Sequence, residues 1–165
     1  MERLWAPWRM EYILDNGKDD GCFLCRAAEA SKKDSASLFV IQKTDMTILV
    51  MNRFPYNNGH LLAAPVRHAA DLTDLSHDEA ADLLEMTALS EKLLRRVVNP
   101  QGFNIGVNIG AVSGAGLPGH VHVHIVPRWQ GDTNFMPVTA DTKIIPQALD
   151  SLYKKLLKAL PEVLG

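Results

Sequence analysis

The most constraining feature of the sequence is a run at residues 120–126 in which histidine alternates with apolar residues (HVHVHIV). Because successive side chains of a β-strand point to opposite faces, the run predicts a strand with His120, His122 and His124 on one face. The intervening apolar residues would then face a hydrophobic core. Half of the six histidines of the chain fall within these few residues, which favours a chemical role over a solvated surface.

The three imidazoles cannot all bind one metal ion on a regular strand. At roughly 3.3 Å per residue, His120 and His124 lie about 13 Å apart, whereas a zinc–nitrogen bond is only about 2 Å long. Two neighbours could share an ion, or one could join ligands from elsewhere, and the middle histidine is left for other work. A neutral imidazole is a good nucleophile toward phosphorus, and closely spaced histidines disfavour each other's protonation.

A C-x-x-C pair, Cys22 and Cys25, supplies candidate metal ligands. His68 closes a predicted strand and His120 opens another, so the four residues match the composition of a Cys2His2 zinc site. Two alternatives stay open at this point. The cysteines could be a redox pair, or two buried thiols with no chemical task.

A glycine-rich segment, residues 108–119, precedes the histidine run. Residues 114–119 spell G-x-G-x-x-G, but the dinucleotide fingerprint needs a strand before it and a helix after it, and here Pro118 leads into a β-rich run. No G-K-[ST] follows, which also excludes a P-loop. The backbone N–H groups of such a turn can still bind phosphate. An ordinary long hairpin loop is the alternative.

The remaining pattern predicts an α+β fold on an antiparallel sheet, with one long central helix and a C-terminal helix. Ser76 and Glu79 form a capping box that opens the long helix, and Asn99-Pro100 closes it. An apolar stripe follows that box at helical spacing: Leu83, Met86, Leu89, Leu93 and Val97. Further strands are predicted at 38–43, 46–51, 61–66 and 103–109, a loop-rich segment at 15–37, and the C-terminal helix at 145–160.

Composition limits the class of protein. A chain of 165 residues with 47% hydrophobic and 22% charged residues predicts a single globular domain, divided into an N-terminal segment (1–37), a core (38–129) and a C-terminal extension (130–165). The net charge of -2 argues against binding to a nucleic acid polymer. No signal peptide and no apolar stretch long enough to span a membrane is found, so the cytoplasm is the expected compartment.

These motifs resemble the histidine triad (HIT) superfamily, whose signature His-φ-His-φ-His-φ-φ, with φ apolar, is matched in full at 120–126. The segment NRFP at 52–55, followed by Gly59-His60 and Pro65, resembles the nucleoside-binding segment of the fragile-histidine-triad branch. The Asn-x-Gly at Asn108 and Gly110 stands where the superfamily places it. LWAPWRMEYI near the start and PRWQGDTNFMP after the histidines resemble a bacterial branch that includes diadenosine tetraphosphate phosphorylases.

The resemblance implies a HIT-like fold and a nucleotidyl hydrolase or transferase. Such an enzyme cleaves a nucleoside phosphate linkage, in a dinucleoside polyphosphate or in AMP joined to another group, through a nucleotidyl-histidine. His122 would be the nucleophile of the triad and His124 would contact phosphate near it. Asn52 would bind the ribose, and Asn108 with the loop near Gly116 would bind phosphate.

The resemblance also implies a structural zinc ion at Cys22, Cys25, His68 and His120, no organic cofactor, and a homodimer paired through the helix and a sheet edge. In one place the sequence departs from the family. Many members carry Gln and Ser or Thr just before the triad, whereas this chain has Gly116 and Leu117 there, and Ser113 is the candidate substitute.

Three interpretations of function remain from the sequence. The first is transfer of AMP to water or another acceptor, with a small adenine nucleotide as substrate. The second is phosphorolysis of diadenosine tetraphosphate by inorganic phosphate, which shares every step up to the covalent intermediate. The third, of a different class, is a nucleotide-binding regulator without significant turnover, against which the intact triad argues.

Overall fold

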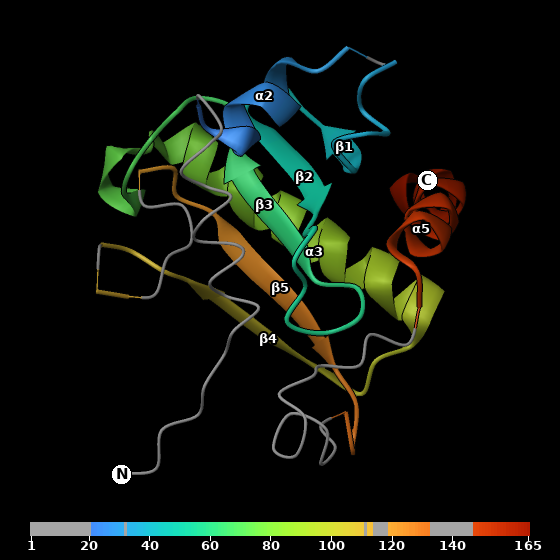
Figure 1. The fold of residues 1–165 in the computed structure, drawn as a ribbon. Helices are drawn as coiled ribbons and strands as arrows, with labels where there is room; N and C mark the ends of the chain where they lie inside the picture. The colour runs from blue at the N-terminus through green and yellow to red at the C-terminus, as the bar shows by residue number, and fades with distance from the viewer. Residues whose placement is uncertain (1–20, 32, 111, 114–118, 133–146) are drawn as a thin grey trace, which may run out of the picture.

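Figure 1 shows a computed structural model of the chain, which describes residues 21–31, 33–110, 112–113, 119–132 and 147–165. Among these residues, five strands form one sheet in the order β1-β2-β3-β5-β4. The strands are β1 (Val40–Lys43), β2 (Thr47–Met51), β3 (Leu61–Pro65), β4 (Gly102–Val107) and β5 (Val123–Arg128). All neighbouring strands run antiparallel, which confirms the predicted α+β fold on an antiparallel sheet.

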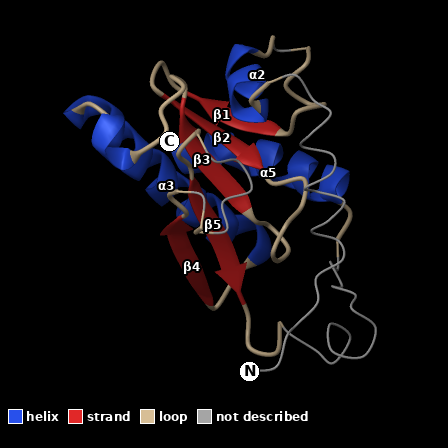
Figure 2. Cartoon of the chain, turned by 60° about the vertical axis from the view of Figure 1, so that its left-hand side comes forward, coloured by secondary structure: helices blue, strands red, loops and turns tan. Residues whose placement is uncertain are grey.

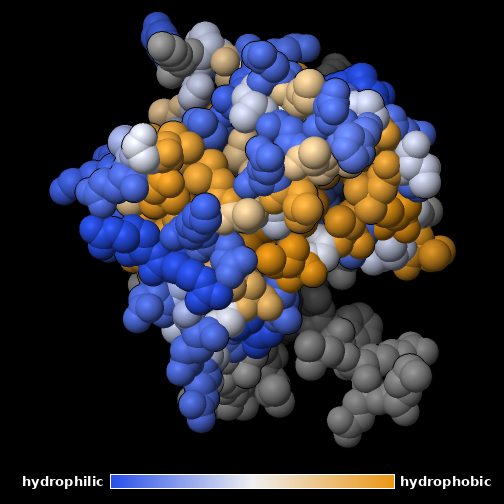
Figure 3. Space-filling model, turned by 180° about the vertical axis from the view of Figure 1, so that it is seen from behind, coloured by the Kyte–Doolittle hydropathy of each residue, from blue (hydrophilic) through white to orange (hydrophobic). Residues whose placement is uncertain are grey.

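Two helices cover one face of the sheet. α3 (His77–Val98) crosses the strands and α5 (Leu149–Leu164) packs against it (Figure 2). Leu93, Leu61 and Ile125 are fully buried in the core between these helices and the sheet. Seen from behind, the surface over this layer carries apolar side chains among hydrophilic ones (Figure 3).

The long helix begins at the predicted capping box. The Ser76 hydroxyl accepts the N–H of Glu79, and the Glu79 carboxylate accepts the N–H of Ser76. A 3-10 turn (Leu72–Asp74) precedes it. The apolar stripe of α3, with Leu83 and Met86 among its buried members, packs on the sheet of its own chain. Burial of these residues in the core of their own chain gives no support to pairing through the helix, and the homodimer stays a prediction.

Residues 23–29 form a helix, α2 (Phe23–Glu29), where a loop-rich segment was predicted. It lies on the face of the sheet opposite α3 (Figure 1). Leu24 and Ala28 are buried against Ile48 and Leu62. The prediction failed because it weighed the polar composition of the whole segment. Within it, alanine, leucine, arginine and glutamate favour a helix, and a short apolar face is enough to dock it.

The histidine strand starts later than predicted. β5 opens at Val123, so His124 is the one triad histidine inside it. The residues just before β5 pair with the loop that follows β3, and the N–H of Val121 donates to the carbonyl of Ala69 over 2.7 Å. The chain there is bonded to a loop rather than to a strand, which ends the regular ladder.

Within β5 the predicted alternation of faces is confirmed. His124 is paired with Leu62, whose side chain belongs to the cluster under α2. Val123 and Ile125 belong to the core under α3. The imidazole of His124 is thus on the α2 side of the sheet.

Other elements differ at their ends. The hairpin of β1 and β2 and the strand ending at Pro65 are confirmed, and β4 is shorter than the predicted 103–109. α5 continues past the predicted end at residue 160 and includes Pro161, while residues 145 and 146 lie outside the described residues. No helix in the described part of the chain is long and apolar enough to cross a membrane. The three-part division of the domain stays a prediction.

Candidate functional site: a Cys2His2 cluster joined to a row of histidines

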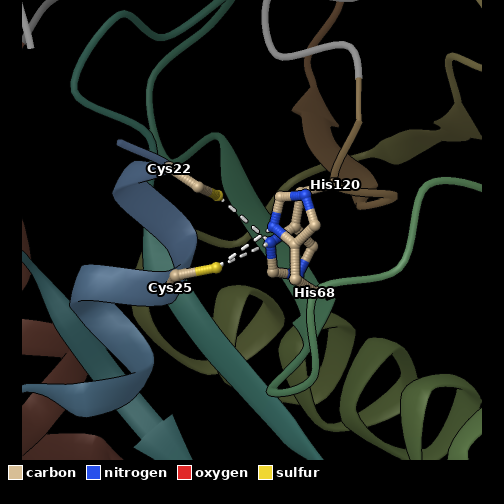
Figure 4. A group of neighbouring side chains, drawn as sticks. All are labelled: Cys22, Cys25, His68 and His120. Carbon is tan, nitrogen blue, oxygen red and sulfur yellow. Dashed lines mark hydrogen bonds between the residues drawn. The ribbon is translucent and has the colours of Figure 1, made fainter. Parts of the chain in front are cut away.

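Four side chains with metal-binding atoms meet beside the end of β3 (Figure 4). The Sγ atom of Cys22 lies 3.1 Å from Nδ1 of His120, and Sγ of Cys25 lies 3.2 Å from Nδ1 of His68. Sγ of Cys25 is also 3.5 Å from Nδ1 of His120. All four donor atoms lie within 4.8 Å of one another. The structure thus brings together the four residues that the sequence grouped.

The separations lie near those around a tetrahedral metal ion, with the Cys22–His120 and Cys25–His68 pairs slightly closer. Bonds of about 2.3 Å to sulfur and about 2.1 Å to nitrogen put tetrahedral donor atoms roughly 3.3–3.8 Å apart. Nε2–H of His120 donates to the carbonyl of Pro65 over 2.9 Å, which leaves Nδ1 with a lone pair for a metal. Burial and the neighbouring Cys22 raise the pKa of the Cys25 thiol to about 11, so a metal must displace a proton there.

The fold explains why distant residues meet. Cys22 is the N-cap of α2, Cys25 lies in its first turn, and α2 is docked by its apolar face on β2 and β3. His68 follows the end of β3, and His120 precedes β5, the neighbouring strand in the sheet. The cluster therefore ties three segments of the chain together at one end of the sheet.

His122 has one ring nitrogen fixed by the backbone. Its Nδ1–H donates to the carbonyl of His120 over 2.8 Å, because a carbonyl can only accept. In the neutral ring Nε2 then carries the lone pair. Burial lowers the pKa of His122, with the bond to His120 opposing this, and the side chain is only 5% exposed. The arrangement presents a neutral, nucleophilic nitrogen at physiological pH.

His124 is held by a histidine outside the triad, His60, which is fully buried. The N–H of Tyr56 donates to Nδ1 of His60 over 3.1 Å, so the proton of a neutral His60 is on Nε2. That N–H donates to Nδ1 of His124 over 3.0 Å. His124 in turn carries its proton on Nε2, and burial, with a smaller effect of His122, lowers its pKa to about 4.

Sequence analysis gave no role to His60. It noted Gly59-His60 as part of a resembling segment, and His60 immediately precedes β3. Assigning a role to His60 requires knowing which strands are neighbours in the sheet. The neighbourhood of β3 and β5 places His60 against His124, and a single sequence does not show that pairing.

Asn52 lies at the end of β2 beside this pair. Its Oδ1 accepts the N–H of Phe54 over 2.9 Å, and its Nδ2 lies 3.1 Å from Nδ1 of His60. The amide therefore shapes the loop between β2 and β3. One lone pair on its oxygen and one N–H remain for a ligand.

The predicted phosphate-binding residues are partly placed. Nδ2 of Asn108 lies 3.5 Å from Nε2 of His124, so Asn108 stands at the open end of the histidine pair. Gly110 has a positive φ of 83°, which glycine adopts without strain, and its carbonyl accepts the Ser113 hydroxyl over 2.7 Å. Ser113 thus closes a turn. Gly116 lies outside the described residues.

A carboxylate at the far end of β5 fixes the loop that carries His60, and sequence analysis missed it. Asp132 accepts two bonds from Arg128, at 2.5 and 2.9 Å, and one from the Asn57 amide at 2.8 Å. Asn57 also donates to the carbonyl of Pro127 and accepts the N–H of His60 through its own carbonyl. Arg128 holds the pKa of the Asp132 carboxyl down at about 2.

Fold and site together define a class: an α+β protein with a row of neutral histidines just before and within β5, and a Cys2His2 cluster at one end of that row. The HIT domain family matches residues 33–131 of the chain. AP-4-A phosphorylase of Mycobacterium tuberculosis is 36% identical over 154 residues, 90% of this chain and 79% of that protein. The chain therefore belongs to the HIT family, as the sequence motifs indicated.

Two further similarities extend this result. A bis(5'-nucleosyl)-tetraphosphatase (asymmetrical) of Schizosaccharomyces pombe is 33% identical over 93 residues, 56% of this chain and 50% of that protein. The crystal structure of a Zn-bound histidine triad family protein from Mycobacterium smegmatis matches with a TM-score of 0.67 and 21% identity. The structural match covers 87% of this chain and 95% of that one, and it supports the assignment of the fold.

Proposed function

We propose that this HIT-family chain is a nucleotide-processing enzyme in which Nε2 of His122 attacks the α-phosphorus of a nucleoside phosphate. A nitrogen–phosphorus bond forms as the bond from phosphorus to the leaving oxygen breaks, and the leaving group departs with that electron pair. An acceptor then attacks the same phosphorus and releases His122. The transferred group is AMP, and the substrate class is a dinucleoside polyphosphate or AMP joined to another group.

One observation carries this proposal: the hydrogen bond of 2.8 Å between Nδ1–H of His122 and the carbonyl of His120. It puts the lone pair on the opposite nitrogen, and burial lowers the pKa of the ring. The nucleophile is therefore neutral without a separate base to deprotonate it.

The neighbouring residues suit a phosphate ligand. His124 carries a proton on Nε2 and can donate it as a hydrogen bond to a phosphate oxygen, and Asn108 stands next to that nitrogen. We assign the ribose to Asn52. We assign phosphate contacts to Asn108, Gly110 and Gly116, while Ser113 is the candidate to assist the leaving oxygen.

A second candidate differs only in the acceptor. The Mycobacterium tuberculosis relative, which matches 90% of this chain, is named a phosphorylase, which favours inorganic phosphate. The Schizosaccharomyces pombe relative is named a tetraphosphatase, which favours water. Phosphorolysis of diadenosine tetraphosphate would release ADP and ATP, whereas hydrolysis would release AMP and ATP.

Product analysis tests both candidates. Purified protein is incubated with diadenosine tetraphosphate or adenosine phosphoramidate, each with and without inorganic phosphate, and with His122→Ala as control. We expect AMP or ADP from the wild-type chain, a labelled protein adduct after acid quench, and a loss of several orders of magnitude in rate for the variant. Binding without turnover or adduct would instead support a nucleotide-binding regulator.

We further propose that the Cys2His2 cluster holds a structural zinc ion. Two thiolates and two imidazoles complete a tetrahedron, so a zinc bound there has no open position for water. Its task would be to fix α2 and the segment before β5. Elemental analysis after adding zinc back should find one zinc per chain, and a redox pair in its place would bind none.

We also propose a homodimer, paired along β4. This strand is one edge of the described sheet and Ile105 on it is 47% exposed. An exposed edge with an apolar residue can pair with a second copy. Light scattering should give twice the 18.2 kDa of one chain, and Ile105→Lys should return the mass to that of one chain.

The cytoplasm stays the predicted compartment.

A further inference from the structure

The aromatic ring of Tyr56 lies over both members of the His60–His124 pair. Its centroid is 4.7 Å from that of His60 at an interplanar angle of 29°, and 5.6 Å from that of His124 at 22°. The two imidazoles are joined beneath it by the hydrogen bond of 3.0 Å. One face of the phenol ring therefore covers the bond and both rings that form it.

The same residue also contacts the pair through its backbone. The N–H of Tyr56 donates to Nδ1 of His60 and, with the Asn52 amide beside the same nitrogen, leaves the proton of a neutral His60 on Nε2. Tyr56 thus helps to fix the direction of the hydrogen bond at one end and covers that bond with its side chain.

Core packing alone does not explain this position. The Tyr56 side chain is 47% exposed, so its outer face is in water while its inner face lies on two imidazoles. Removing it would open the histidine pair to solvent. Water competes for both partners of a buried hydrogen bond and would let His60 and His124 exchange or redistribute their protons.

We propose that Tyr56 is a positioning residue of the site: its ring excludes water from the His60–His124 hydrogen bond and so keeps the proton of His124 on Nε2, facing the phosphate. The proposal rests on the proposed function for its catalytic consequence. The shielding itself is a property of the folded chain, and it can be measured without any substrate.

The test uses the full-length, metal-loaded protein and three variants, Tyr56→Phe, Tyr56→Leu and Tyr56→Ala. Nitrogen-15 histidine labelling identifies the Nε2–H proton of His60 and its exchange with water. We expect a slowly exchanging proton in the wild type, retained with Phe, faster with Leu and lost with Ala. Leu84→Ala, a truncation at an exposed position of α3, controls for general effects.

Single-turnover labelling of His122 gives the second measurement. We expect Tyr56→Ala to slow labelling by about tenfold to a hundredfold, within the range for a positioned proton donor, with little change in KM. Tyr56→Phe should restore the wild-type rate. Slow exchange and normal labelling in Tyr56→Ala would overturn the proposal. So would a Phe variant as impaired as Ala, or a change confined to KM.

The two proposals fail in different ways. If the wild-type chain forms no adduct at His122, the proposed function is wrong, while the exchange measurement still decides the role of Tyr56. If adduct forms at the same rate in all variants, the proposed function stands and the role of Tyr56 is wrong.

Discussion

Replacing Asp132 by asparagine tests the anchor of the loop that carries His60. The Asp132 carboxylate is only 7% exposed and accepts bonds from Arg128 and Asn57. Asparagine keeps the size and one acceptor oxygen but removes the charge. The variant therefore measures the contribution of the Asp132 charge separately from that of the size of its side chain.

The pKa shift of Asp132 gives the expected loss of folding free energy in the Asp132→Asn variant. Bonds from Arg128 above all, with further bonds from the Trp129 N–H and the Asn57 amide, lower the pKa of the Asp132 carboxyl from 3.8 to about 2. At about 1.36 kcal/mol per pKa unit this corresponds to about 2 kcal/mol of folding free energy. Because the Arg128 side chain is 43% exposed, solvent screens part of it, and we expect a loss of about 1–2 kcal/mol for Asp132→Asn. For a chain of 165 residues that lowers Tm by roughly 3–6 °C.

The direction of the pKa shift predicts how this stabilisation changes with pH. A carboxyl whose pKa is lower in the folded state stabilises the protein above its unfolded pKa and loses that contribution as the pH falls. The difference in the free energy of unfolding between wild type and Asp132→Asn should be constant above pH about 5 and fall to roughly half by pH 3.

Urea denaturation followed by circular dichroism, at four pH values from 7 to 3, measures the difference. Any effect of the Cys2His2 cluster on stability is the same in both proteins and cancels in the difference. Asp45→Asn, at an exposed turn position, controls for the change in net charge. A difference at neutral pH no larger than that of the control, or one that stays constant down to pH 3, would refute the reasoning.

Three further substitutions test other parts of the structure. Ser76→Ala removes a hydroxyl of the capping box and should lower the free energy of unfolding by about 1 kcal/mol, measured in urea. Cys25→Ser should reduce bound zinc well below one per chain in elemental analysis, and a stoichiometry equal to wild type would contradict the cluster. His60→Gln should slow labelling of His122 by about tenfold or more while the sheet remains folded by circular dichroism, and an unchanged rate would remove the role of the His60–His124 bond.

The sequence was sufficient for those parts of the fold that local rules decide. The capping box at Ser76 and the stripe after it predicted α3. Short apolar runs bounded by turn residues predicted the strands, with period-two alternation used for the histidine run. α2 was not predicted because its short apolar face lies within a segment whose overall composition is polar. The start of β5 was placed too early. The strand ladder stops where the residues before Val123 bond to the loop after β3, and the alternation of histidine with apolar residues does not show that bond.

The site was predictable in its residue types but not in its contacts. The length of a strand already showed that the three histidines cannot share one ion, and the cluster at His120 agrees with that reasoning. His60 and Asp132 were missed because their importance comes from long-range pairing. His60 meets His124 across two strands, and Asp132 reaches back to Asn57. No local pattern in the sequence encodes either contact.

His120 links the Cys2His2 cluster to the proposed nucleophile. Its Nδ1 faces the two cysteines, its Nε2–H is held by Pro65, and its carbonyl accepts Nδ1–H of His122. A ligand that fixes the side chain of His120 therefore also fixes the carbonyl that directs the lone pair of His122. Since four protein ligands leave a tetrahedral ion no open position, a metal bound there would act on the proposed reaction through position alone. Loss of metal should accordingly loosen the segment before β5 first, and slow the reaction only because His122 is no longer held.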